Sequence, residues 1–263
     1  MIEFEIPNDM KRKVIIITQD DPFYLPGLLP EFLNDLSEKV DIVGAVILKA
    51  SPFGVKKSFC AKIVSTFKIF GFKFFAFYTW MYIVNKCILR SKMSPIFEQS
   101  NIPLIKLDRS INHHESIKAI KNYAPNLMIS ILGNEVFKSS LLEVAPCLNL
   151  HTAALPKYRG LMPSFWVLKN KERFSAVSVF WVDEGIDSGP ITVQNFFKVE
   201  GMTQRNLIKH SKKLGLEAIL EAVEKIQRGD DSIIDNKDKD ATYFSFPTKK
   251  DVIEFYQSGG RFI

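Results

Sequence analysis

Three polar residues have types and spacing that could carry out acid–base chemistry on a carbonyl group. Asn149 and His151 lie two apart in the apolar run "CLNLH", so a β-strand would place both side chains on one face. Asp187 follows in "VDEGIDSGP", whose glycines allow a backbone to approach a ligand closely. An amide can stabilise an oxyanion, and an imidazole with a carboxylate can move a proton. The alternative is structural: His151 is a hydrogen-bonded core histidine, and Asn149 stabilises a turn.

Other chemistries have less support in the sequence. A serine triad is disfavoured because there is no GxSxG elbow. No metal site is expected, because His113, His114 and His210 occur in helical segments that we expect to be exposed. The first predicted strand is not followed by GxGxxG, and GxxxxGK[ST] does not occur. A dinucleotide cofactor or a P-loop nucleotide is therefore poorly supported.

Predicted strands and helices alternate along the chain, and they would position these residues. Apolar, β-branched runs predict strands at 13–19, 41–49, 102–108, 127–133, 147–151, 176–182 and 190–199. Helical apolar spacing predicts helices at 26–39, 113–124 and 204–229, the last ended by its glycine. This alternation predicts an α/β fold with a doubly wound, mostly parallel sheet. Such sheets bind ligands beyond the carboxyl ends of their strands, which is where the three polar residues lie.

Composition fits one folded α/β domain with an extension. The chain has 263 residues, of which 46% are hydrophobic and 24% charged. We expect a catalytic domain at 1–199, followed at 200–263 by a helix and a docked tail. The net charge of +6 favours anionic partners. Three widely spaced cysteines without a CxxC pair indicate a reducing compartment, and the N-terminus lacks the order of a signal peptide, so we expect a cytoplasmic protein.

An apolar, aromatic segment at 60–92 stands apart from this pattern. Lys68, Lys73 and Lys86 interrupt it, so stable membrane insertion is not expected. One interpretation is a pair of helices that pack on the body or form a subunit contact, as in a homodimer. The other is a basic, aromatic face that touches a membrane surface.

Two motifs in order resemble the folate-dependent formyltransferases. "LNLHTAALPKYRG" contains an Asn-x-His strand and a Leu-Pro-x-x-Arg-Gly loop, and "DEGIDSG" is an Asp-x-Gly-x-Asp-x-Gly loop. The resemblance implies a Rossmann-like domain that transfers a formyl group from 10-formyltetrahydrofolate to an amine without a metal. It makes Asn149, His151 and Asp187 the catalytic residues. Asn149 would bind the oxyanion, with His151 sharing that task or supplying a proton. Asp187 would fix the tautomer of His151 or relay the amine's proton.

The resemblance also implies that backbone groups of two segments hold the pterin ring of the folate. Here these segments are 132–137 and 182–187. The cofactor-binding residues that follow from this are Gly133, Asn134, Val136, Val182, Asp183 and Gly185.

Differences between this sequence and related enzymes indicate which amine accepts the formyl group. Asp20 and Asp21 occupy the place of the phosphate loop of the glycinamide ribonucleotide enzyme and would repel a phosphate. Only residues 200–263 follow the last predicted strand, where the initiator-tRNA enzyme carries a further domain. The chain is therefore most similar to the compact sugar N-formyltransferases, with a nucleotide-linked amino sugar as acceptor and no DNA partner. Charged initiator tRNA, or hydrolysis of the formylfolate, is the alternative. Lys157 and Arg159 are candidates for substrate binding, although Arg159 could instead brace its loop.

Overall fold

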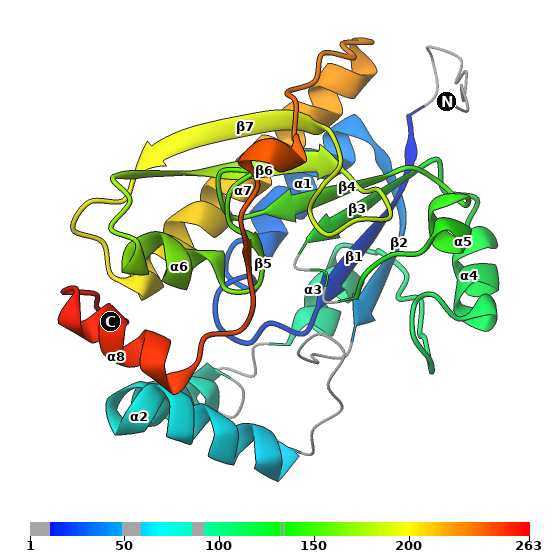
Figure 1. The fold of residues 1–263 in the computed structure, drawn as a ribbon. Coiled ribbons are helices and arrows are strands. Elements are labelled where there is room, and N and C mark those ends of the chain that lie inside the picture. Colours follow the sequence, from blue (N-terminus) through cyan, green and yellow to red (C-terminus); the bar gives the residue numbers. More distant parts are fainter. Residues whose placement is uncertain (1–10, 49–58, 86–91, 132, 134) are drawn as a thin grey trace.

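A six-stranded sheet forms the centre of the computed structural model, which describes residues 11–48, 59–85, 92–131, 133 and 135–263 (Figure 1). The strand order is β2-β1-β3-β4-β6-β7, in which the first four strands run parallel and β6 and β7 are antiparallel to their neighbours. The strands are β1 (Lys13–Gln19), β2 (Asp41–Leu48), β3 (Leu127–Ile131), β4 (Cys147–His151), β6 (Phe174–Trp181) and β7 (Ile191–Lys198).

Helices cover both faces of this sheet, which confirms the doubly wound α/β prediction. The core on one face is formed with α1 (Leu29–Lys39), α3 (Met93–Gln99) and α7 (Gln204–Gln227). The opposite core is formed with α4 (His114–Lys121) and α5 (Ser139–Leu142). Because both faces are covered, β1 is an unbroken apolar run in which Ile15, Ile16 and Ile17 are all fully buried. Each such side chain contributes roughly 1.5–3 kcal/mol of apolar burial.

One predicted strand is absent from the sheet. Residues 102–108 form a single isolated bridge, between Leu104 and Ala45 of β2, rather than a strand. Pro103 lies at this edge and has no N–H to donate, although its carbonyl accepts a hydrogen bond from the amide of Ala45. The apolar run is explained by burial of Ile102 and Ile105 beside β2 instead.

The residues beyond 199 continue the same body. Helix α7 begins at the Thr203 cap, packs on β4, β6 and β7, and ends before Gly229, whose φ of +68° only glycine adopts readily. The chain then passes a 3₁₀ turn (Asp238–Asp240), and β8 (Tyr243–Phe244) pairs in parallel with β5 (Arg159–Gly160). Helix α8 (Lys249–Gln257) starts with a capping box between Thr248 and Asp251.

The aromatic segment forms α2 (Phe59–Ile83), which is divided by a kink at Gly71, where φ is +79°. It packs on the body through a third core cluster that includes α6 (Pro163–Lys169) and α8. Phe70 and Phe74 contact the ring of Phe262, and the hydroxyls of Tyr24 and Tyr78 are 2.9 Å apart. This agrees with the expected helices packed on the body, while residues 86–91 lie outside the described part. Among the helices described, none has the length and apolarity to cross a membrane.

The loop after β1 contains a buried ion pair. Lys212 of α7 donates to Asp21 over 2.6 Å, and both side chains are buried. The same carboxylate accepts hydrogen bonds from the amides of Phe23 and Leu25. The expectation that Asp21 repels a phosphate is therefore wrong, because its charge is balanced within the fold. Its hydrogen bonds nevertheless occupy two amides that could otherwise have bound an anion.

Candidate active site

Strand β4 carries Asn149 and His151 to the carboxyl edge of the sheet. Asn149 lies between Ser130 of β3 and Phe180 of β6 in the strand register, and its side chain is half-buried. His151 pairs with Ser178 of β6 and is buried. The strand therefore delivers both polar residues to the place where an open sheet binds its ligands.

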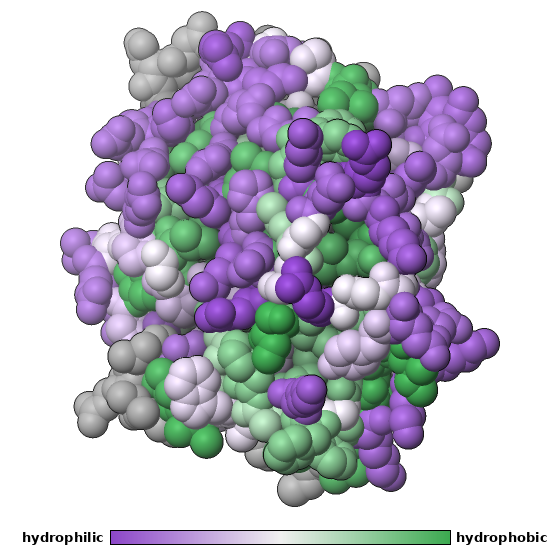
Figure 2. Space-filling view, turned by 90° about the vertical axis from the view of Figure 1, so that its left-hand side faces the viewer, coloured by the Kyte–Doolittle hydropathy of each residue, from purple (hydrophilic) through white to green (hydrophobic). Residues whose placement is uncertain are grey.

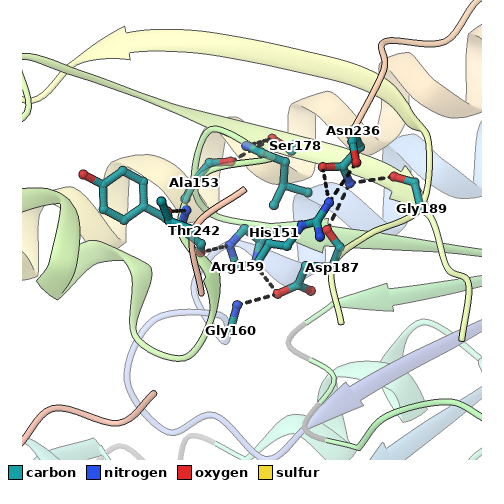
Figure 3. A network of polar contacts seen from close by, with 11 residues as sticks. His151, Ala153, Arg159, Gly160, Ser178, Asp187, Gly189, Asn236 and Thr242 are labelled. Atoms are coloured by element: carbon teal, nitrogen blue, oxygen red, sulfur yellow. Dashed lines mark hydrogen bonds and ion pairs between the residues drawn. The ribbon is translucent and has the colours of Figure 1, made fainter. Parts of the chain in front are cut away.

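The three residues predicted from their spacing do come together. His151 Nδ1 lies 3.5 Å from Asp187 Oδ2, and the same oxygen accepts a hydrogen bond of 2.8 Å from the amide of Gly160 (Figure 3). Asp187 thus lies between the end of β4 and the start of β5. His151 is thus a buried histidine that has a carboxylate from a loop as one of its partners.

The other ring nitrogen of His151 is held by the backbone. Nε2 lies 2.8 Å from the carbonyl oxygen of Tyr158. A carbonyl only accepts, so Nε2 carries the hydrogen of this bond, and Nδ1 is left to face Asp187. In the neutral ring, the bond to Tyr158 therefore sets the tautomer. The sequence held no signal for this, because any residue type supplies the same carbonyl. Of the two roles expected of Asp187, this geometry favours relay of the amine's proton over fixing of the tautomer.

The loop that presents Asp187 has a tightly constrained backbone. Asp183 Oδ1 accepts hydrogen bonds from the amide of Gly185 and from the hydroxyl of Ser188. A Cβ on Gly189 would lie 1.7 Å from the carbonyl oxygen of Trp181, so only glycine fits there. Asp187 itself has a φ of +51°, a conformation that aspartate tolerates better than most residues. Close approach of the backbone thus requires glycine at position 189, while a Cβ on Gly185 would clash with the side chain of Ser188.

A pocket opens in front of Asn149 and Asp187. Its lining includes Gly133, Val136, Val182 and Gly185, four of the residues expected to hold a folate; the others are Ser130, Glu135, Phe137, Asn149, Phe180, Ile186 and Asp187. Asp183 organises the loop behind it, and Asn134 lies outside the described residues. His151 is not part of the lining, so it reaches the pocket through Asp187.

Ser130 is a site residue that the sequence reasoning missed. It is buried at the end of β3, beside Asn149 in the sheet. Its hydroxyl lies 2.5 Å from the place where a Cβ on Gly133 would be, so a larger residue at 133 would force the side chain of Ser130 to move. The signal was present in "LMISILG", where one polar residue interrupts an apolar strand in the same way as Asn149.

The two residues predicted to bind substrate differ in their surroundings. Lys157 is exposed on the loop before β5. Arg159 is buried, and its Nη2 donates to the carbonyl and to Oδ1 of Asn236, at 2.8 and 3.1 Å. This is the geometry of the alternative in which Arg159 braces its loop.

Asn236 joins the C-terminal segment to the loop that carries Asp187. Its Nδ2 donates to the carbonyl oxygens of Asp187, at 3.0 Å, and Gly189, at 2.7 Å, while its own oxygens accept from Arg159 (Figure 3). The residue is buried and lies far along the chain from the motifs, where nothing in the sequence pattern marks it. We infer that Asn236 positions the backbone of Asp187.

Replacing Asn236 by alanine should lower kcat by roughly tenfold to a hundredfold, because Asp187 would be displaced while the pocket lining remains. KM should change little. Loss of the amide leaves two buried carbonyls unpaired and should cost about 2 kcal/mol of unfolding free energy. Asn195→Ala is the matched control, since the Asn195 amide donates a hydrogen bond to the exposed Glu221, away from the Asp187 loop. If both variants have the same kcat, Asn236 does not position the site.

No group of three or more His, Cys, Asp or Glu residues suited to a metal ion occurs in the described part of the chain.

Comparisons with known proteins give a consistent picture. The family model described as formyl transferase matches residues 12–223. The methionyl-tRNA formyltransferase of Kosmotoga olearia is 31% identical over 174 residues, which are 64% of this chain and 55% of that protein. That of Thermotoga maritima is 30% identical, over 60% of this chain and 51% of that protein. The chain spans about half the length of the curated relatives it matches.

Solved structures with low sequence identity share the fold. The N-formyltransferase from Helicobacter canadensis, in complex with folinic acid and dTDP-3-aminofucose, has a TM-score of 0.58 at 16% identity. That likeness covers 94% of this chain and 80% of the other. Glycinamide ribonucleotide transformylase 1 from Symbiobacterium toebii has a TM-score of 0.58 at 14% identity, covering 87% of this chain and 92% of the other.

Proposed function

The chain belongs to the formyl transferase family, and on that premise we propose that it transfers a formyl group from 10-formyltetrahydrofolate to the amine of a nucleotide-linked sugar. The observation that carries the proposal is the convergence of Asn149, His151 and Asp187 at the carboxyl edge of the sheet, beside a pocket. These groups supply the hydrogen-bond donor and the proton acceptor that transfer of an acyl group to an amine requires.

The reaction would proceed through a tetrahedral intermediate. The amine nitrogen attacks the formyl carbon, and Asn149 donates a hydrogen bond to the oxygen that becomes negative. The amine's proton moves to Asp187, directly or through water, and is shared with the free Nδ1 of His151, 3.5 Å away. The bond between the formyl carbon and the folate nitrogen then breaks, and that nitrogen takes the proton. The products are the formamide and tetrahydrofolate.

The folate would lie against Gly133, Val136, Val182 and Gly185, which line the pocket. Glycine at two of these positions is favoured by neighbouring atoms rather than by a ligand, because a Cβ would clash with Ser130 or Ser188. No metal has a part in this proposal.

A sugar acceptor is supported by the likeness to the Helicobacter canadensis enzyme, whose complex contains a nucleotide-linked aminofucose. Lys157 is exposed on the loop next to β5 and could contact the diphosphate of such a substrate. The two amides bound to Asp21 are not free to hold a phosphate at the first loop, as an acceptor like glycinamide ribonucleotide would need. Charged initiator tRNA is the second candidate, because the curated relatives are methionyl-tRNA formyltransferases.

The acceptor can be identified by measuring tetrahydrofolate release from 10-formyltetrahydrofolate in separate reactions. These contain a panel of nucleotide-linked amino sugars, charged initiator tRNA, or no amine. Release that depends on an amino sugar supports the proposal. Formylation of the tRNA alone would replace the sugar as acceptor, and release without any amine would make the protein a hydrolase.

Replacing Asn149 by alanine should reduce kcat by about 10²–10³-fold, because the oxyanion loses a hydrogen-bond donor. KM for the folate should change little, since the ground-state carbonyl depends less on this bond. Asn149→Asp should be as slow, because it keeps the size of the side chain and replaces the donor with a negative acceptor. A kcat within about threefold of the parent for Asn149→Ala would remove Asn149 from the mechanism.

A further inference from the structure

The outer face of α2 is apolar, although it lies on the surface. Beyond the kink, Phe74, Tyr78 and Met81 face the body, and Phe74 and Tyr78 contact the aromatic rings of the core. At the same helical spacing on the opposite side, Phe72 and Trp80 are 72% and 61% exposed. A surface helix normally turns polar residues toward water. This helix instead has one apolar face for the body and a second one directed outward.

Exposed apolar side chains occur on both sides of the kink. Apart from Tyr82, whose ring contacts Phe23 of the body, the exposed large hydrophobic residues of α2 are Ile63, Val64, Phe67, Phe72, Trp80 and Ile83, and we call these six the α2 outer face. Figure 2 shows hydrophobic residues gathered over the lower part of the molecule, at the level where Figure 1 places α2. A contiguous exposed patch of this kind marks an interaction site.

The sequence that contains α2 carries charge of one sign. Residues 42–97 contain nine lysines and arginines and neither aspartate nor glutamate. Lys68 and Lys73 lie within the helix among the exposed aromatic residues, and both are exposed. The partner that fits this face must therefore accept apolar side chains and offer negative charge beside them.

We propose that the α2 outer face docks on an anionic phospholipid surface, with the helix lying in the plane of the interface. Aromatic side chains with interspersed lysines are favoured where acyl chains meet charged headgroups. A second copy of this chain fits less well, because a two-fold contact through this face would bring lysines together without an acidic residue in the segment to pair with them. A nucleic acid would satisfy the lysines but would leave the apolar side chains without a partner.

Vesicle binding of the full chain tests this proposal. The protein is mixed with vesicles of phosphatidylcholine containing phosphatidylglycerol, or of phosphatidylcholine alone, and bound protein is measured by sedimentation. Binding should require the anionic lipid and weaken at high salt. Each of Phe72→Glu and Trp80→Glu should weaken it by roughly tenfold to a hundredfold. Lys68→Gln and Lys73→Gln should each weaken it about fivefold.

Tryptophan fluorescence reports the contact directly, since Trp80 is exposed while Trp166 is buried and Trp181 is half-buried. Its emission should shift to shorter wavelength with anionic vesicles, and the shift should disappear in Trp80→Phe, which should still bind. The controls are circular dichroism and tetrahydrofolate release without vesicles, which Phe72→Glu should leave unchanged. The proposal is overturned if anionic vesicles bind no protein or bind Phe72→Glu/Trp80→Glu equally well. It is also overturned if, without lipid, the chain forms a dimer that this double variant dissolves.

Discussion

Replacing His151 by asparagine should lower kcat by about 10²–10⁴-fold, the range typical of a lost acid–base group. Asparagine has no basic nitrogen, so the contact between Nδ1 and Asp187, now 3.5 Å, cannot be reproduced together with the bond to Tyr158. The amine's proton could then no longer be shared between Asp187 and the side chain at position 151. KM for the folate should change by only a few-fold, because His151 does not line the pocket.

The measurement is single-turnover formation of tetrahydrofolate with a saturating amine, alongside binding of the folate at equilibrium. His210→Asn is the matched control, since His210 is exposed on α7 and contacts only the ring of Phe197 among the ring contacts described. It should keep the parent rate. A His151→Asn variant that folds, binds folate and retains a rate within about threefold of the parent would show that the proton is transferred elsewhere.

Replacing Lys212 by methionine should lower the free energy of unfolding by about 3–5 kcal/mol, because Asp21 would keep its charge in a buried place without a partner. Methionine fills most of the space of the lysine stem, so the loss is electrostatic rather than a cavity. Urea denaturation with an unchanged slope measures the difference. Lys213→Met, at the exposed neighbouring position on α7, should cost less than about 0.5 kcal/mol.

The double variant Asp21→Asn/Lys212→Met separates the charge from the packing. It should be more stable than Lys212→Met alone, since no uncompensated charge remains. If Lys212→Met and Lys213→Met are equally stable, the buried pair does not matter for stability.

The same pair makes stability depend on pH on the acid side. Burial alone would raise the pKa of Asp21, but the Lys212 charge and the amides of Phe23 and Leu25 outweigh it and hold the pKa below its ordinary value. A carboxyl whose pKa is lowered by folding contributes stability above its unfolded pKa of about 3.9. That contribution is lost as the pH falls through the folded value. The stability difference between the parent and Asp21→Asn should therefore shrink below about pH 4.

Local sequence patterns were sufficient to predict most of the sheet and the three polar residues at the centre of the site. Period-two spacing predicted that Asn149 and His151 share one face of a strand. Because open sheets bind ligands beyond the carboxyl ends of their strands, Asp187 was expected beside them, and the structure places it there. The strand predicted at 102–108 was wrong, because a segment buried beside an edge strand has the same apolar composition as a strand. Asp21 was misread for a related reason, since its partner Lys212 is distant in the sequence.

The remaining contacts of the site cannot be predicted from composition or spacing. The carbonyl of Tyr158 fixes the tautomer of His151, and backbone groups are the same for every residue type. Asn236 acts from the C-terminal segment across the fold, and an isolated asparagine in a polar stretch is ordinary. Contacts of this kind depend on the three-dimensional path of the chain.

The pairing of β5 with β8 has a consequence for how the protein is made. Residues 159 and 160 are bridged by 243 and 244, and Asn236 holds the Asp187 loop from the same late segment. A ribosome delivers the chain from its N-terminus, so the sheet and all three polar residues emerge before these supports exist. The site then has its reactive groups without their final geometry. Its assembly is therefore completed only after α7 has emerged and the segment that follows it can pair with β5.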